Sequence, residues 1–95
     1  MTEQTDAATT VRQKRLRFRC WHRGTREMDL LLGGFADRHI ASFEPADLDA
    51  LEALLECPDP EIYAWITGHR AEPAGIARSL LTRFRTDIES TSGKR

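Results

Sequence analysis

The sequence predicts an all-α protein, a small bundle of about five short helices. Its apolar residues recur three and four positions apart along most of the chain, and no stretch of several residues alternates with the period of two of a half-buried strand. Glycine and proline fall between the periodic segments, where they end one helix and precede the next. A chain of 95 residues suits one domain with one modest core.

The expected helical domain covers residues 11–89, between two tails. Residues 1–10 and 90–95 lack apolar periodicity, so we expect both tails to be mobile. No run approaches the roughly 20 apolar residues of a membrane span, no secretory signal is apparent, and two cysteines are too few for a disulfide scaffold. We therefore expect a soluble cytoplasmic protein.

The first helix is expected over Val11 to His22 and leads into a charged turn, residues 23–27, which reads Arg23-Gly24-Thr25-Arg26-Glu27. Gly24 suits the left-handed conformation that commonly follows a helix C-terminus. Thr25 is then the expected N-cap of the second helix.

The second helix is expected to bury one face of the run Met28 to Phe35. Gly33 and Gly34 interrupt it, and each costs about 1 kcal/mol relative to alanine. The pair therefore indicates a kink or a close crossing with a neighbouring helix, and we favour packing over a direct function.

Three further helices follow. The third is expected to open at Pro45, the fourth after Cys57-Pro58 with Asp59 as N-cap and Gly68 at its end, and the fifth near Pro73. The expected core combines Phe35 with the apolar stripes of these helices: Leu48, Leu51, Leu54, Leu55, Ile62, Trp65, Ile66, Ile76, Leu80, Phe84 and Ile88.

The charges are segregated along the chain. Every charged residue from Arg12 to Arg26 is basic and every one from Glu44 to Glu61 is acidic, although the net charge is only −1. This pattern predicts a positive and a negative side. A basic helix can bind nucleic acid, but the acidic helices and the lack of a recognition helix rich in Arg, Asn or Gln favour a protein partner.

The sequence offers no constellation for catalysis or metal binding. The three histidines lie on different expected elements, neither cysteine has a base marked for it, and no glycine-rich loop has nucleotide-binding spacing. We expect no metal, no stably bound cofactor and no enzymatic activity. Trp65 is expected in the core, whereas Trp21, beside the charged turn, is undecided.

The charged turn suggests a displayed contact site. Arg23 offers a planar fork of donors, Gly24 lets another backbone come close, and Glu27 adds an acceptor. The alternative is an ordinary helix cap with a surface ion pair worth at most about 1 kcal/mol. Spacing alone favours that alternative.

Two segments, taken together, favour a contact site over an ordinary helix cap. One is Arg23-Gly24-x-x-Glu27 followed by Met28-Asp29, and the other is the run from Leu54 to Trp65, LLECPDPEIYAW. At this separation they resemble the succinate dehydrogenase assembly factor 2 family, the flavinylation factors. The similarity extends from about Arg15 to about Arg85.

The resemblance implies a five-helix chaperone, not an enzyme. Such a protein binds the flavoprotein subunit of succinate dehydrogenase, and often that of fumarate reductase, and promotes covalent attachment of FAD to a histidine of that subunit. The resemblance implies partner binding through five residues of the turn and its neighbourhood: Arg23, Gly24, Arg26, Glu27 and Asp29. It leaves the role of His22 open. We expect a monomer that forms a one-to-one complex, without nucleic acid or membrane contact.

Two other functions stay open. The basic first helix permits a nucleic-acid-binding or toxin-neutralising protein, whose binding would weaken strongly with added salt. Alternatively, Trp21 could stack on a flavin while Arg23 and Arg26 pair with its phosphates, which would make the chain a carrier of FAD.

Overall fold

The computed structural model describes residues 2–92, and its regular secondary structure there is entirely helical. The elements in chain order are α1 (Thr2–Trp21), α2 (Arg26–His39), the short 3-10 helix η1 (Ile40–Ser42), α3 (Pro45–Leu55), α4 (Asp59–Ile66) and α5 (Arg78–Ser92). The predicted fold class, an all-α bundle of five short helices, is confirmed for this part of the chain.

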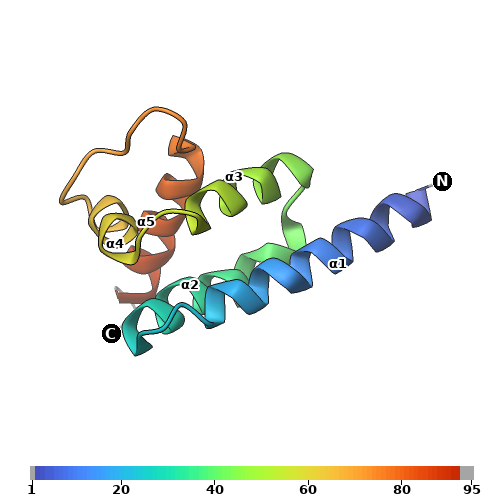
Figure 1. Cartoon of the computed structure of the whole chain (residues 1–95), viewed down its shortest axis with the longest axis horizontal. Helices are drawn as coiled ribbons and strands as arrows, with labels where there is room; N and C mark the ends of the chain where they lie inside the picture. The colour runs from blue at the N-terminus through green and yellow to red at the C-terminus, as the bar shows by residue number, and fades with distance from the viewer. Residues whose placement is uncertain (1, 93–95) are drawn as a thin grey trace.

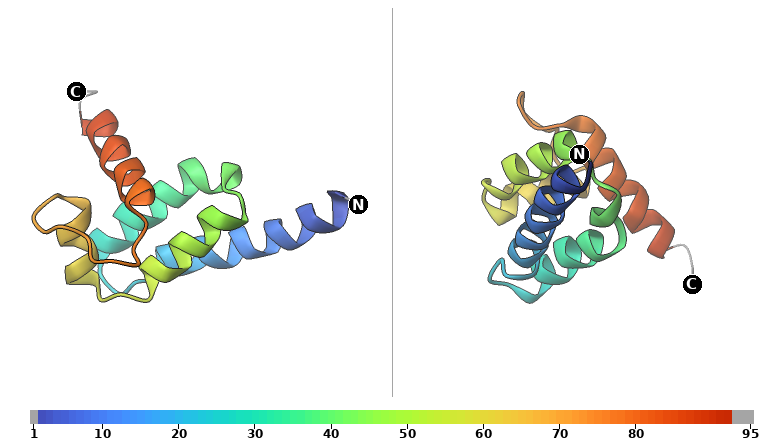
Figure 2. Two further views of the ribbon diagram at one scale, coloured as in Figure 1. Left: turned by 90° about the horizontal axis from the view of Figure 1, so that it is seen from above. Right: turned by 90° about the vertical axis from the view of Figure 1, so that its right-hand side faces the viewer.

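The helices form two groups around one core (Figure 1). α2 runs antiparallel beside the C-terminal half of α1 (Figures 1 and 2). The other three helices, α3, α4 and α5, lie together on one side of this pair. The N-terminal half of α1 extends past the other helices. None of the helices in the described part of the chain is both long and apolar enough to cross a membrane.

Parts of the two segments that were expected as tails are helical in the structure. α1 begins at Thr2, so it includes most of residues 1–10, and α5 continues to Ser92. Met1 and residues 93–95 lie outside the described residues. The mobility of the two tails stays a prediction.

The core contains the residues that the apolar stripes predicted. Phe35 of α2 stacks on Phe84 of α5 with ring centroids 3.7 Å apart, which joins the two groups of helices. Ile76 and Ile88 are only partly buried, at the margin of the core. The fully or almost fully buried residues are Leu16, Cys20, Met28, Leu32, Phe35, Ala36, Ile40, Phe43, Leu48, Leu51, Leu54, Leu55, Ile62, Trp65, Ile66, Leu80, Leu81 and Phe84.

Three expected helix starts are wrong. α1 begins at Thr2 and not at Val11. α5 begins at Arg78 and not near Pro73, because Gly75 adopts a φ of +97° and the Ile76 amide closes a turn onto the Pro73 carbonyl. A left-handed residue cannot continue a right-handed helix. α4 begins one residue early, with Pro58 as N-cap and Asp59 as its first residue.

Gly33 explains how α1 and α2 approach so closely. A Cβ atom on Gly33 would lie 2.1 Å from Cδ2 of Trp21, closer than any real contact, so only glycine fits beneath the indole ring. The indole nitrogen donates a hydrogen bond to Asp37 at 3.2 Å. The prediction that the glycine pair serves packing is thus confirmed at Gly33, and Trp21 is a packing residue.

Candidate functional site

The charged turn takes the backbone conformation that its sequence favours. Gly24 has a φ of +116°, which glycine adopts far more readily than other residues. Thr25 caps α2, since its Oγ1 accepts a hydrogen bond from the Met28 amide at 3.3 Å. Apart from Gly24 and its two chain neighbours, no atom of the described residues lies within 4 Å of where a Cβ on Gly24 would be. The space beside Gly24 is therefore open to a partner.

The Arg23 side chain points into the molecule. Its Nε donates to Asp59 at 2.8 Å, and its two terminal nitrogens donate to the carbonyls of Leu55 at 2.8 Å and Cys57 at 3.0 Å. Only 13% of the side chain is exposed. Arg23 therefore ties the charged turn to the corner between α3 and α4.

Asp29 braces the same turn from the other side. Its Oδ1 accepts a hydrogen bond from the backbone amide of Arg23 at 2.6 Å. Since Arg23 and Asp29 direct polar groups toward the protein itself, the structure gives both a bracing role. Direct contact of either residue with a partner stays a prediction.

The other three residues expected at the site form its exposed edge. Gly24, Arg26 and Glu27 are all exposed. Among residues 8–90, whose side chains are described, neither Arg26 nor Glu27 forms an ion pair. The sequence motif thus separates into a partly buried brace, Arg23 and Asp29, and an exposed edge whose cation and carboxylate are unpaired within that range.

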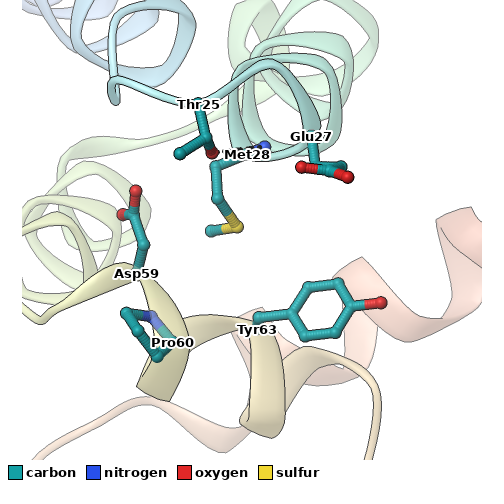
Figure 3. Close-up of a pocket in the computed structure, with 6 residues that line it drawn as sticks. All are labelled: Thr25, Glu27, Met28, Asp59, Pro60 and Tyr63. Carbon is teal, nitrogen blue, oxygen red and sulfur yellow. Dashed lines mark hydrogen bonds between the residues drawn. The ribbon is translucent and has the colours of Figure 1, made fainter.

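A hollow of about 420 Å³ opens next to this edge, between the start of α2 and α4 (Figure 3). Figure 3 shows the Met28 side chain reaching from α2 toward α4. Glu27 of α2 and Tyr63 of α4 lie on opposite walls, at the same end of the hollow. We call it the α2–α4 hollow, and its lining residues are Thr25, Glu27, Met28, Asp59, Pro60 and Tyr63.

Exposed apolar side chains flank the charged turn. Phe18 is 62% exposed and stacks on His22 with ring centroids 3.9 Å apart, Leu30 is 54% exposed, and Tyr63 is 47% exposed. Phe18 and Leu30 lie in hollows that share Trp21 and His22 as lining residues. A mixed apolar and charged surface therefore surrounds the turn.

Sequence reasoning did not select Phe18, Leu30 or Tyr63. A signal was present, because Phe18 falls between Leu16 and Cys20 of the buried stripe, on the opposite face of its helix. Exposed apolar residues indicate a contact with another molecule when they gather in a patch, and Phe18 and Leu30 both lie beside Trp21 and His22.

The basic first helix is only partly free to bind an anion. Arg12 pairs with Asp49 at 2.6 Å and with Glu52 at 2.8 Å, and Arg19 pairs with Glu56 at 2.9 Å. The basic stretch and the acidic stretch of the sequence therefore face one another across α1 and α3. This contact modifies the expected picture of one positive and one negative side.

The cysteines differ in their surroundings. Cys20 is fully buried, and burial raises the pKa of its thiol to about 12. Cys57 is partly buried, and burial also raises its pKa. Over the described residues, no group of three or more His, Cys, Asp or Glu side chains is arranged to hold a metal ion.

Comparisons with known proteins agree on one family. A family model described as flavinator of succinate dehydrogenase matches residues 14–87. The FAD assembly factor SdhE of Acetobacter pasteurianus is 40% identical, over 87% of this chain and 76% of that protein. The FAD assembly factor SdhE of Vibrio cholerae is 34% identical, over 73% of this chain and 80% of that protein.

Eukaryotic relatives match as well. The mitochondrial succinate dehydrogenase assembly factor 2 of Debaryomyces hansenii is 38% identical over 68% of this chain, but this match covers only 46% of that longer protein. No solved structure matches the chain.

Proposed function

Because the chain belongs to the family of flavinators of succinate dehydrogenase, we propose that it binds the flavoprotein subunit of succinate dehydrogenase and promotes covalent attachment of FAD to a histidine there. The observation that carries this proposal is the exposed edge of the charged turn. Gly24, Arg26 and Glu27 lie within the matched residues 14–87, and Arg23 and Asp29 fix their position from inside the molecule.

The chain acts as a chaperone, since the groups that react belong to the partner. Attachment requires the partner's imidazole to be neutral and directed at the 8α-carbon of the flavin. A bound helper accelerates this step when it binds best to the conformation in which that geometry is populated. Its own side chains then need to bind and orient, and none has to exchange a proton with the flavin.

The residues of the exposed edge have distinct roles in this proposal. Gly24 lets the backbone of the partner approach, because the space beside it is open. Arg26 donates to partner carbonyl or carboxylate groups, and Glu27 accepts from partner donors. Phe18 and Leu30 add apolar contact area on the α1 side.

The brace makes this edge effective. Preorganised groups bind more tightly because less conformational freedom is lost in the complex. Arg23 fixes the turn through three hydrogen bonds to the α3–α4 corner, and Asp29 fixes the Arg23 amide. Both residues therefore contribute to binding by holding the exposed edge in place.

The ion pairs between α1 and α3 favour this function over nucleic-acid binding. Arg12 and Arg19 are already paired with carboxylates, so fewer cations are left to neutralise phosphates. Because these opposite charges pair within one chain, they do not hold two copies of it together, and we propose a complex of one chain with one flavoprotein subunit.

Co-expression tests the proposal. The flavoprotein subunit from the same organism is produced with the wild-type chain, with no chain, or with the Gly24→Arg, Glu27→Ala or Glu89→Gln variant. Flavin fluorescence that stays with the subunit after denaturation in detergent reports covalent attachment. Glu89 is the control, an exposed carboxylate on α5.

We expect covalent flavin to increase with the wild-type chain and with Glu89→Gln, and to fall toward the level without the chain for Gly24→Arg and Glu27→Ala. Far-UV circular dichroism of each purified variant verifies that it is folded. Equal covalent flavin with and without the wild-type chain, at equal amounts of folded subunit, contradicts the proposed function.

A further inference from the structure

The α2–α4 hollow has a specific chemical character that indicates which kind of partner donor Glu27 accepts. Its base is Met28, which is 5% exposed, and its walls carry the Glu27 carboxylate and the ring of Tyr63. Figure 3 shows these two side chains on the same side of the hollow. None of the described residues that line it is basic.

The two carboxylates of the hollow differ in availability. Asp59 is paired with the Arg23 guanidinium at 2.7 Å, and its side chain is 21% exposed. Glu27 has no ion pair among residues 8–90 and is exposed. Within that range its negative charge remains unpaired at the rim, across the hollow from Tyr63.

This combination selects a cation. A guanidinium can form two parallel hydrogen bonds to a carboxylate and can stack on an aromatic ring, and an ammonium can make the same contacts as a point charge. The methylenes of either side chain can pack against the apolar base. An anion such as a phosphate would be repelled by Glu27, so the hollow does not suit the phosphates of FAD.

We propose that the α2–α4 hollow receives a basic side chain of the flavoprotein subunit, which pairs with Glu27 and lies against the ring of Tyr63. This inference rests on the proposed function and specifies the chemistry of one partner residue. Guanidinium geometry fits the pairing of carboxylate and ring best, because its plane serves both contacts. The exposed edge then presents Arg26 to acceptors of the partner and Glu27 to a cation.

Equilibrium titration of the chain into the purified flavoprotein subunit gives the first test. We expect Glu27→Gln to raise Kd about tenfold or more, as for the loss of a charge-assisted hydrogen bond. We expect Tyr63→Leu to raise Kd about threefold to tenfold, and Tyr63→Phe, which keeps the ring, to bind within about twofold of wild type. Glu89→Gln is the matched control and should bind like wild type.

Folding does not confound these variants, because both residues lie on the surface of their helices. Each variant should show the far-UV spectrum and thermal midpoint of the wild-type chain. If Glu27→Gln and Tyr63→Leu both bind like wild type, the inference is overturned.

Photo-crosslinking identifies the partner residue directly. A benzoylphenylalanine placed at position 63 is crosslinked to the subunit, and mass spectrometry locates the attached segment. The inference predicts an arginine or lysine in that segment. Changing that residue to glutamate should weaken binding, and combining this change with Glu27→Arg should restore it at least partly. A segment without a basic residue, or a lack of any restoration, overturns the inference.

The outcomes separate this inference from the proposed function. If the wild-type chain increases covalent flavin but the titration shows no effect of Glu27→Gln and Tyr63→Leu, only the occupant of the hollow is wrong. If the wild-type chain neither binds the subunit nor increases covalent flavin, the proposed function itself fails, and the inference fails with it.

Discussion

Substituting Gly33 with alanine tests whether the crossing of α1 and α2 depends on the absence of a side chain. A Cβ at this position would meet three ring atoms of Trp21 at 2.1, 2.4 and 2.6 Å, so the indole or the helix must move. Gly34 provides a matched control in the same helix. A Cβ there would lie 3.3 Å from Nη1 of Arg38, so a shift of that side chain by a few tenths of an ångström is enough.

The expected magnitude follows from comparing the two variants. Alanine has a higher helix propensity than glycine by about 1 kcal/mol, and this gain applies to both positions. Overpacking a well-packed contact costs about 1–3 kcal/mol and applies only to Gly33→Ala. Gly34→Ala should therefore be more stable than Gly33→Ala by about 1–3 kcal/mol, which is roughly 4 °C or more in thermal midpoint for a domain of this size.

Urea unfolding followed by far-UV circular dichroism and tryptophan fluorescence measures this difference. Fluorescence also reports whether Trp21 has moved into solvent. Combining Gly33→Ala with Trp21→Ala should remove most of the cost, because the clashing ring is gone. Equal stability of Gly33→Ala and Gly34→Ala would refute the proposed packing of Trp21 on Gly33.

Three further predictions concern residues away from the exposed edge. Arg23→Lys should lower the free energy of unfolding by about 1–3 kcal/mol in chemical denaturation, because lysine lacks the fork that serves Leu55, Cys57 and Asp59. The hydrogen bond from Arg38 lowers the pKa of Asp87, so its stabilisation is complete above the ordinary pKa and is lost as pH falls through the lowered pKa. Asp87→Asn should therefore be less stable than wild type at pH 7, with a gap that closes at acidic pH in pH-dependent unfolding. Cys20, with a pKa raised to about 12, should have about a thousandfold less thiolate at pH 8 than a free thiol, and mass spectrometry should find it alkylated by iodoacetamide only after unfolding.

The order of the helices could be predicted from the sequence because their stripes and caps are local features. The Thr25 cap, the left-handed Gly24 and the Pro45 helix start all depend on neighbouring residues only. The expected start of α5 was wrong because Ile76 was taken as part of the helical stripe. In the structure Ile76 lies in a turn and packs beside the core.

The start of α1 could not be found from apolar periodicity. Thr2 to Thr10 lies on the part of α1 that extends past the other helices, so it has no core to face and needs no apolar stripe. Periodicity predicts a helix only where one side of it is buried.

The sequence singled out the charged turn but not how the surroundings of its residues differ. Arg23 and Glu27 are four residues apart in one charged turn, yet the Arg23 side chain is mostly covered and Glu27 is exposed. The hydrogen-bond partners of the Arg23 side chain are 32 to 36 residues away in the chain, so no local pattern reveals them. The α2–α4 hollow joins two such distant segments and was missed for the same reason.

A purified system shows whether the chain itself accelerates the covalent attachment of FAD to the flavoprotein subunit. The flavoprotein subunit, prepared without bound flavin, is mixed with FAD in the presence or absence of the chain, and covalently attached flavin is measured over time after denaturation. We expect a faster initial rate with the wild-type chain and a rate near the unassisted one with Gly24→Arg. The same rate with and without the wild-type chain would contradict the proposed function.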